Sequence, residues 1–197
     1  MSHFDTRAKN WDKGNTQVAG AKVIADAIQA KITLNDTMEI IDFGTGTGLL
    51  GFNIATSVKQ VHGVDTSRKM LEKLEEKNSA SLHIIPYHQD ILEEPLTEKF
   101  DGLVSSMTLH HIENVRLFFQ TVYKTLTENG FVAIADLEQE DRTFHSDNTG
   151  VFHYGFEKEA LIKVVQECGF NHVSFENINT IKKTHRNFGV FLLIAYK

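Results

Sequence analysis

The side chains with the clearest capacity for chemistry lie in residues 38–51, which read MEIIDFGTGTGLLG. An apolar run ends in Asp42, glycine then alternates with other residue types, and an apolar run with helical character begins at Leu49. A strand that leads directly into a helix leaves the first backbone N–H groups of the helix without intrahelical partners. Glycines let a ligand come close to that backbone. This stretch therefore predicts a ligand-binding turn.

Two glycine patterns overlap in this turn. One is Asp42-x-Gly44-x-Gly46-x-Gly48, and the other is Gly46-x-Gly48-x-x-Gly51, which matches the dinucleotide fingerprint and favours a nicotinamide-dependent oxidoreductase. Asp42 separates the alternatives, because an acidic side chain directly before the cradle would repel a pyrophosphate. A ligand with an ammonium beside a carboxylate fits better, since Asp42 would balance the ammonium while the glycine backbone receives the carboxylate.

Two further carboxylates, Asp65 and Asp90, fall at or just beyond the ends of the next two predicted strands. Ligands of open parallel sheets bind at the carboxyl ends of the strands, and a carboxylate about 20 residues beyond the turn suits ribose hydroxyls. Asp90 is placed to accept a hydrogen bond from an adenine amine, with the backbone of Gln89 and Ile91 nearby. An amino acid, a ribose and an adenine together make S-adenosylmethionine, which these residues predict as the cofactor.

The elements that must position these residues alternate between strands and helices. Helical spacing or capping predicts helices at residues 16–32, 49–59, from Ser67 through Leu74, 115–130 and 161–169. After the strand that ends in Asp42, apolar runs predict strands at residues 60–65, 81–86, 100–106 and 131–137. Such alternation implies right-handed crossovers and a parallel sheet that helices cover on both faces.

The end of the chain departs from this alternation. Residues 172–183 and 188–196 are two strand-like runs with only residues 184–187 between them. That gap is too short for a crossover helix, so the two strands should be antiparallel neighbours. Before them, residues 138–155 lack periodicity and hold His145, His153 and Tyr154, and long loops of this kind are commonly functional or disordered.

Four motifs in the same order resemble those of class I S-adenosylmethionine-dependent methyltransferases. They are the Asp42 glycine turn, Asp65, the run Gln89-Asp90-Ile91 and the run FDGLVSSMTLHHI at residues 100–112, and the resemblance covers roughly residues 4–170. It implies a doubly wound α/β fold with a mostly parallel seven-stranded sheet, an antiparallel last strand and helices on both faces. The antiparallel pair inferred above agrees with this fold independently.

The resemblance also implies roles for individual residues. Asp42, Gly44, Thr45, Gly46 and Gly48 would hold the methionine part of the cofactor. Asp65 would bind the ribose, with Thr66 and Met70 nearby; Gln89, Asp90 and Ile91 would frame the adenine; and Ser106 would lie beside the sulfonium.

Methyl transfer from a sulfonium is an in-line displacement, so much of the catalysis can come from positioning the donor and the acceptor. A general base is needed only if the acceptor must lose a proton. The candidates for this base are His110, His153 and Tyr154. No histidine pair has compact ligand spacing with a third donor nearby, so we expect no catalytic metal.

The acceptor class follows by exclusion. Residues 105–108 (SSMT) lack the Asn/Asp-Pro-Pro-aromatic motif with which related enzymes hold a planar amine, and the single Cys168 disfavours an arsenic acceptor bound by several thiolates. A small metabolite is the best remaining class. The resulting prediction is a small-molecule methyltransferase, and the alternatives are the oxidoreductase or a non-catalytic module that binds S-adenosylmethionine.

Composition limits the domain organisation, the partners and the compartment to be expected. The chain has 197 residues, a net charge of −6 and a single cysteine, which indicates one domain at residues 1–197 without a disulfide framework. The acidic balance argues against nucleic-acid and lipid-surface partners. No signal peptide or membrane span is evident, so the cytoplasm is the expected compartment, and the oligomeric state is open. Residues 1–15 form a polar arm that could close over a ligand as a lid.

Overall fold

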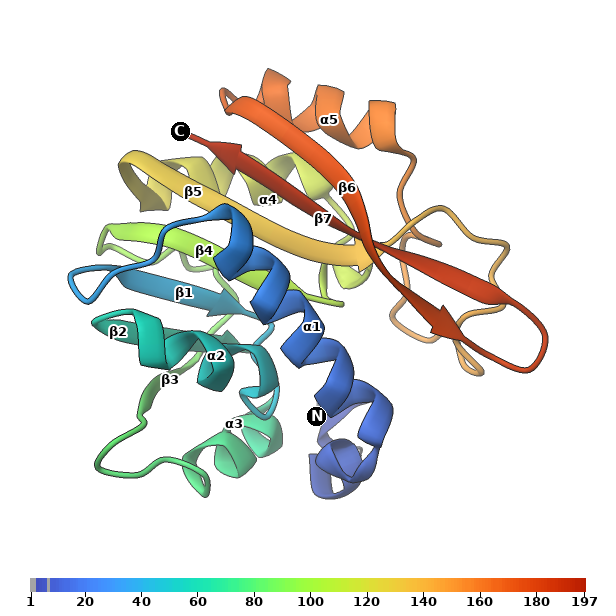
Figure 1. Cartoon of the computed structure of the whole chain (residues 1–197), viewed down its shortest axis with the longest axis horizontal. Coiled ribbons are helices and arrows are strands. Elements are labelled where there is room, and N and C mark those ends of the chain that lie inside the picture. The colour runs from blue at the N-terminus through green and yellow to red at the C-terminus, as the bar shows by residue number, and fades with distance from the viewer. Residues whose placement is uncertain (1–2, 7) are drawn as a thin grey trace.

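In the part of the chain that the structure describes, residues 3–6 and 8–197 of a computed structural model, seven strands form one sheet (Figure 1). The strands are β1 (Glu39–Phe43), β2 (Gln60–Asp65), β3 (Ile84–His88), β4 (Phe100–Ser106), β5 (Leu126–Leu137), β6 (Asn171–Lys182) and β7 (Asn187–Tyr196). The α-helices are α1 (Asn15–Lys31), α2 (Leu49–Ile54), α3 (Arg68–Glu75), α4 (Val115–Thr125) and α5 (Lys158–Glu167). Short 3-10 helices are η1 (His3–Thr6), η2 (Ala8–Lys13), η3 (Ala55–Ser57) and η4 (Leu109–His111).

The strand order is β3-β2-β1-β4-β5-β7-β6, which confirms the predicted doubly wound fold. From β1 the chain builds outward through β2 to β3, then returns to place β4 on the other side of β1. β7 runs antiparallel between β5 and β6, as the short connection at residues 184–187 predicted. The reversal of winding between β1 and β4 opens the crevice in which ligands of such sheets bind.

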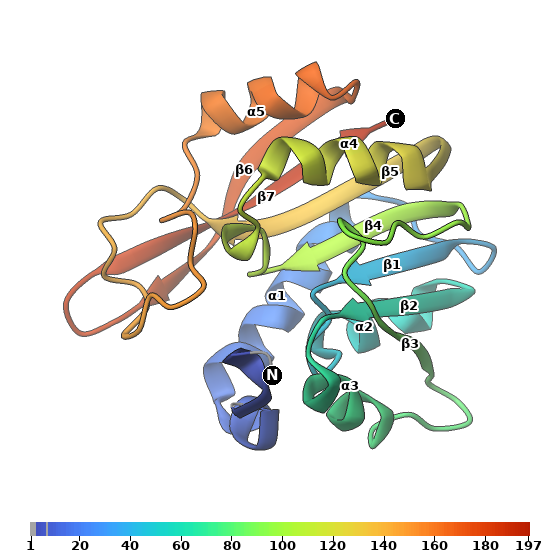
Figure 2. The same cartoon turned by 180° about the vertical axis from the view of Figure 1, so that it is seen from behind.

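Helices cover both faces of the sheet, with α1 and α2 in front of it in Figure 1 and α4 and α5 in front in the reverse view of Figure 2. Successive residues of β5 alternate between the two cores. Ala133 belongs to the cluster that contains Ile28 of α1, whereas Val132 and Ile134 belong to the cluster that contains Phe118 of α4. Burial on both faces explains why residues 131–135 of this strand are all apolar.

One helix end differs from the prediction. The glycine at position 130 suggested that the helix continues to residue 130, but α4 ends at Thr125 and β5 begins directly at Leu126. Leu126 is buried and pairs with Phe100 of β4, so burial of its side chain draws it into the sheet. Gly130 lies within the strand, where its carbonyl accepts a hydrogen bond from Lys197 N at 2.8 Å.

Two further boundaries shift by a few residues. The strand predicted at residues 81–86 is observed as Ile84–His88, because Ser79 N donates to Leu82 O and closes a turn before it. The helix predicted at residues 49–59 is α2 followed by η3, in which Ser57 Oγ donates to Gln29 Oε1 of α1 at 2.7 Å. Neither change moves the glycine loop.

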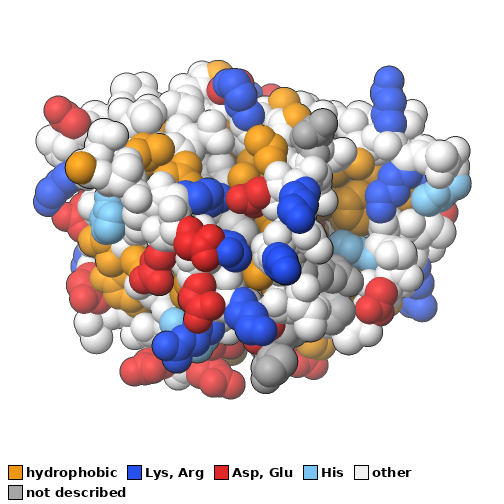
Figure 3. Space-filling model, turned by 90° about the horizontal axis from the view of Figure 1, so that it is seen from below, with side chains coloured by type: hydrophobic (Ala, Val, Ile, Leu, Met, Phe, Trp, Pro, Cys, Tyr) orange, Lys and Arg blue, Asp and Glu red, His pale blue; other side chains and the backbone are white. Residues whose placement is uncertain are grey.

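Basic and acidic side chains are intermixed on the face seen from below in Figure 3. Among the described residues, no helix combines the length and apolar character needed to traverse a lipid bilayer.

Candidate functional site

The loop between β1 and α2 has the backbone that its glycines permit. Gly44, Gly46 and Gly48 have φ values of +66, +54 and +84°, which lie in the left-handed region that favours glycine. Gly44 N and Thr45 N both donate to Val64 O, at 2.9 and 3.1 Å, so the loop folds back against β2. A Cβ at Gly46 would meet nothing within 4 Å. The loop therefore presents the Gly46 backbone to open space, where a ligand can approach.

Asp42 lies beneath this loop and is only 1% exposed. Its Oδ2 accepts hydrogen bonds from Thr45 Oγ1 at 2.7 Å and from Gly51 N at 3.0 Å. Burial raises the pKa of Asp42 to about 6, and the two hydrogen bonds only partly oppose this. The role that the sequence predicts for Asp42, balancing a ligand ammonium, stays a prediction; in the structure its Oδ2 holds the loop and the first turn of α2.

The carboxylate of Asp65 joins the end of β2 to the glycine loop. Its Oδ2 accepts from Gly46 N at 2.8 Å, and its Oδ1 accepts from Ser67 N at 2.7 Å. Burial raises the pKa of Asp65. The Ser67 hydroxyl accepts from Met70 N and so caps α3 as predicted, Met70 is buried, and Thr66 is exposed.

The predicted adenine residues follow β3. Gln89 N donates to Asp65 O at 3.2 Å, which brings the ends of β2 and β3 together. Asp90 is exposed and its Oδ1 accepts from Leu92 N at 2.9 Å, whereas Ile91 is 1% exposed and packs in the core.

Ser106 ends β4 on the same edge of the sheet, so the structure brings the predicted cofactor residues together along one edge. Its carbonyl accepts from Thr108 Oγ1 at 3.1 Å. Thr108 also fills the space that a Cβ at Gly44 would need, at 2.3 Å, so the segment after β4 packs tightly on the glycine loop.

The N-terminal arm, formed by η1 and η2, reaches the same edge. Thr47 Oγ1 of the glycine loop donates to Asp12 Oδ1 at 2.5 Å, and Lys77 pairs with Asp12 Oδ2 at 2.8 Å. Ser67 Oγ donates to Asp5 Oδ1 at 2.7 Å. Figure 1 shows the arm beside α3 at the lower end of α1. Residues 1, 2 and 7 of the predicted arm lie outside the described residues.

Of the candidate bases, His110 has the most distinctive surroundings. It is 1% exposed, and its Nδ1 lies 2.7 Å from Oδ1 of Asp136, which is itself fully buried. The ring centroid of His110 is 4.1 Å from that of His111 and 5.0 Å from that of His145. Sequence reasoning missed Asp136, although an acidic residue inside the apolar run 131–137 was a usable signal, comparable to Asp42.

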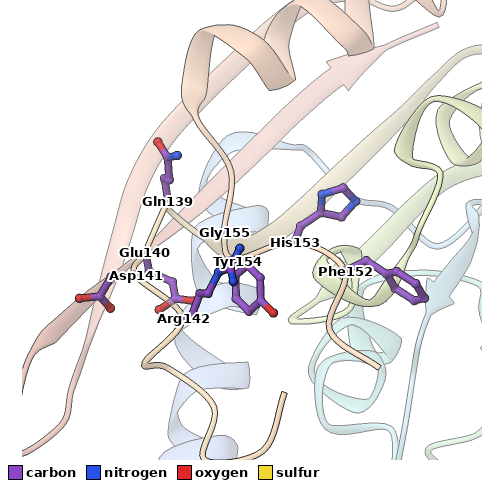
Figure 4. Close-up of a pocket in the computed structure, with 8 residues that line it drawn as sticks. All are labelled: Gln139, Glu140, Asp141, Arg142, Phe152, His153, Tyr154 and Gly155. Atoms are coloured by element: carbon purple, nitrogen blue, oxygen red, sulfur yellow. The ribbon is translucent and has the colours of Figure 1, made fainter. Parts of the chain in front are cut away.

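His153 and Tyr154 line a cavity of about 380 Å³ (Figure 4), and the cavity adjoins the cluster of rings, because His153 N donates to His110 O at 3.1 Å. His153 Nε2 is 2.9 Å from Ile112 O, so this nitrogen carries the hydrogen and donates it to the carbonyl. The Arg142 guanidinium lies 4.6 Å from the centroid of the Tyr154 ring. The cavity is lined by Gln139, Glu140, Asp141, Arg142, Phe152, His153, Tyr154 and Gly155.

Among the described residues, no group of three or more His, Cys, Asp or Glu side chains is arranged to hold a metal ion. A glycine loop at the switch point of a doubly wound sheet, with carboxylates at neighbouring strand ends, defines a nucleoside-binding α/β protein. The family model of the methyltransferase domain matches residues 34–188, which include this whole edge of the sheet. The chain therefore belongs to the class I S-adenosylmethionine-dependent methyltransferase family, as its motifs predicted.

Relatives of known sequence agree with this assignment. A methyltransferase of Schizosaccharomyces pombe that is itself uncharacterised is 30% identical over 173 residues, which are 78% of this chain and 58% of that protein. A second uncharacterised methyltransferase, from Mycobacterium tuberculosis, is 30% identical over 115 residues, which are 58% of each chain. The chain thus spans only 58% of the length of both relatives.

Solved structures share the fold. A methyltransferase of Haloferax volcanii, determined in complex with the Trm112 methyltransferase activator, superposes with a TM-score of 0.78 at 15% identity and covers 100% of this chain and 98% of that one. Phosphoethanolamine N-methyltransferase 2 of Haemonchus contortus in complex with S-adenosyl-L-methionine has a TM-score of 0.72 at 18% identity, over 98% of this chain and 57% of that one. S-adenosylmethionine is the cofactor of this family, which replaces the nicotinamide alternative drawn from the overlapping glycine pattern.

Proposed function

We propose that this protein transfers the methyl group of S-adenosylmethionine to a small-molecule acceptor. The observation that carries the proposal is the glycine loop, whose Gly46 backbone faces open space beside the carboxylate of Asp65. A carboxylate offers about four lone-pair sites. The backbone donors Gly46 N and Ser67 N occupy two of them, so Asp65 retains acceptor capacity for the ribose hydroxyls.

The acceptor side supports a small ligand. The cavity of about 380 Å³ beside His153 and Tyr154 falls within the range of small-molecule sites, about 300–1,000 Å³. Its lining includes aromatic rings and the Arg142 guanidinium, which can orient a polar ligand. Catalysis then consists of holding the acceptor in line with the sulfonium, assisted by a base from His110, His153 or Tyr154 where the acceptor must lose a proton.

Isothermal titration calorimetry with S-adenosylmethionine and S-adenosylhomocysteine tests the cofactor. Replacing Asp65 by alanine should weaken binding by about 1–3 kcal/mol, because ribose hydroxyls would be left without their acceptor. Asp26→Ala, which removes an exposed carboxylate paired with Lys22, is the matched control and should bind like the unmodified protein. A folded sample that gives no heat with either ligand would rule out the proposed function. Binding without methylation of any acceptor in a broad panel would indicate a non-catalytic module.

We also propose that the arm covers the bound cofactor. Its support is that Asp12 and Asp5 accept hydrogen bonds from Thr47 of the glycine loop and Ser67 at the start of α3. Asp12→Ala should weaken cofactor binding by about 0.5–1.5 kcal/mol, the net value of one hydrogen bond, and should accelerate dissociation measured by stopped flow. Equal dissociation rates for Asp12→Ala and the Asp26→Ala control would contradict a covering role.

A further inference from the structure

The Asp136 carboxylate contacts both the ring and the backbone N–H of His110. The carboxylate Oδ1 lies 2.7 Å from His110 Nδ1, and Oδ2 accepts from His110 N at 3.1 Å. Leu137 N also donates to Oδ1, at 2.7 Å. Asp136 is 0% exposed and His110 is 1% exposed, so the pair is sealed from solvent. The ring of His110 is therefore held in one orientation at the end of β5.

The pairing fixes which ring nitrogen carries the hydrogen. Burial opposes ionisation of Asp136, but charge attraction and hydrogen bonding from His110 outweigh it and hold the pKa of this carboxyl below its usual range. An ionised carboxylate can only accept, so His110 Nδ1 is the donor and Nε2 takes no part in the pair. Among the described residues, this Nε2 has no hydrogen-bond partner although it is buried.

A second imidazole lies beside the His110 ring. The rings of His110 and His145 are 5.0 Å apart, and His145 Nε2 is likewise buried without a partner among the described residues. Burial lowers the pKa of His145 to about 4, so this ring is neutral at pH 7. Buried polar atoms without partners are rare in native structures. Two of them side by side point to a polar ligand group that binds here.

The location matches the chemistry of the transfer step. His110 lies in η4, four residues after Ser106, which is expected beside the sulfonium. We propose that His110, positioned by Asp136, accepts the proton of a hydroxyl group on the acceptor, so that the reaction is an O-methylation. This inference rests on the proposed function and names its acceptor class.

A hydroxyl group is the acceptor that most needs a general base. Its oxygen is a weak nucleophile while the proton is attached, whereas an uncharged amine attacks through a free lone pair and a thiol ionises readily near neutral pH. In the step, the acceptor oxygen forms a bond to the methyl carbon as the carbon–sulfur bond breaks. The bonding pair stays on sulfur, which becomes a neutral thioether, and the hydroxyl proton moves to His110 Nε2.

Charge balances within the pair after this step. The positive charge of the sulfonium ends on the His110 imidazolium, beside the carboxylate of Asp136, so no isolated charge is left buried. The other groups that face the ring are His111 on the same 3-10 helix and His145 from the loop before α5. Lys183, directly after β6, acts electrostatically on His145.

Proton-coupled nitrogen-15 spectra of the histidine rings, recorded with saturating S-adenosylhomocysteine at pH 7, test the assignment without any acceptor. We expect His110 to carry its hydrogen on Nδ1 and to have a bare Nε2, and we expect Asp136→Asn to lose this preference. A His110 ring with its hydrogen on Nε2, or one that stays charged up to pH 8, would overturn the inference. Absence of cofactor binding in the calorimetry would instead reject the proposed function itself.

Turnover gives the second readout, with S-adenosylhomocysteine formation measured on phenol, aliphatic alcohol, thiol and tertiary amine probes. We expect methylation among the hydroxyl probes, and kcat reduced by about 100- to 10,000-fold in His110→Gln with the cofactor Kd unchanged within about twofold. Asp136→Asn should lower kcat more than it changes KM. Glu39→Gln, which alters the pair between the half-exposed Glu39 and the buried His62, is the control and should leave kcat unchanged. Turnover confined to thiols or tertiary amines would overturn the inference. If no probe is methylated, the nitrogen-15 spectra of the His110 ring decide whether the inference stands.

Discussion

Truncating Phe191 to alanine is expected to lower the free energy of unfolding by about 3–5 kcal/mol, because a large aromatic side chain leaves a cavity that the surrounding core cannot fill. Phe191 lies in β7 and is 0% exposed. Its ring stacks on Phe175 with centroids 4.2 Å apart and meets the edge of Phe156 at 6.1 Å. Urea denaturation followed by circular dichroism measures the loss.

Leu117→Ala provides the matched comparison, since this apolar side chain is 42% exposed and its removal should change stability by about 0.5 kcal/mol or less. Equal denaturation midpoints for Phe191→Ala and Leu117→Ala would contradict the assigned packing. The effect extends to the proposed site, because Phe191 is the register partner of Asp136 in the adjacent strand. We therefore expect Phe191→Ala to disturb the His110 ring spectra as well.

The second large effect concerns pH and the buried carboxylate under the glycine loop. Burial raises the pKa of Asp42 to about 6 from an ordinary value of 3.8, and a shift of roughly two units corresponds to about 3 kcal/mol. The unfolded chain gives up this proton near its ordinary pKa, while the folded protein holds it until about 6. The stabilising contribution of the protonated form is therefore fully present below the ordinary pKa, and it is lost as the pH rises through about 6.

Asp42→Asn removes this titration and keeps a carbonyl oxygen that can accept from Thr45 and Gly51. The stability of the variant relative to the unmodified protein should increase by about 1–2 kcal/mol from pH 5 to pH 8. The unmodified protein loses this much of its stabilisation as Asp42 ionises over that range. Urea denaturation at both pH values measures it. A difference between the two proteins that does not change with pH would show that Asp42 titrates normally.

The lowered pKa of His145 changes stability in the opposite direction over the same pH range. Burial lowers its pKa to about 4, so its contribution to stability is present above the ordinary value of 6.5 and is lost as the pH falls toward 4. Because His145 is present in both proteins, comparing Asp42→Asn with the unmodified protein isolates the carboxylate. A pH profile of the unmodified protein alone would mix the two effects.

Two buried carboxylates near strand ends, on β1 and β5, have different roles at the site. Asp42 fastens the loop that is expected to receive the cofactor, through Thr45 and Gly51. Asp136 holds the ring that is expected to receive the acceptor's proton. Both are the last but one residue of an apolar strand, so the sheet can place each carboxylate near the carboxyl end of its strand and still keep water away from it.

The sequence by itself determined the features that depend on local pattern. Alternating strand and helix periods predicted the parallel sheet, the short connection at residues 184–187 predicted the antiparallel pair, and Ser67 was correctly expected to cap the next helix. The glycine spacing after Asp42 led to the cofactor and the family. These inferences succeed because backbone geometry, capping and burial patterns act between residues close in the chain.

Only the tertiary structure decided the contacts between distant residues. The end of α4 at Thr125 depends on the pairing of Leu126 with Phe100, and that pairing overrides the glycine stop signal at Gly130. His110 and Asp136 lie 26 positions apart and meet because β5 runs beside β4, whose end leads into η4. Asp12 reaches Thr47 across 35 positions. No local pattern specifies such pairs, because packing of the whole sheet brings them together.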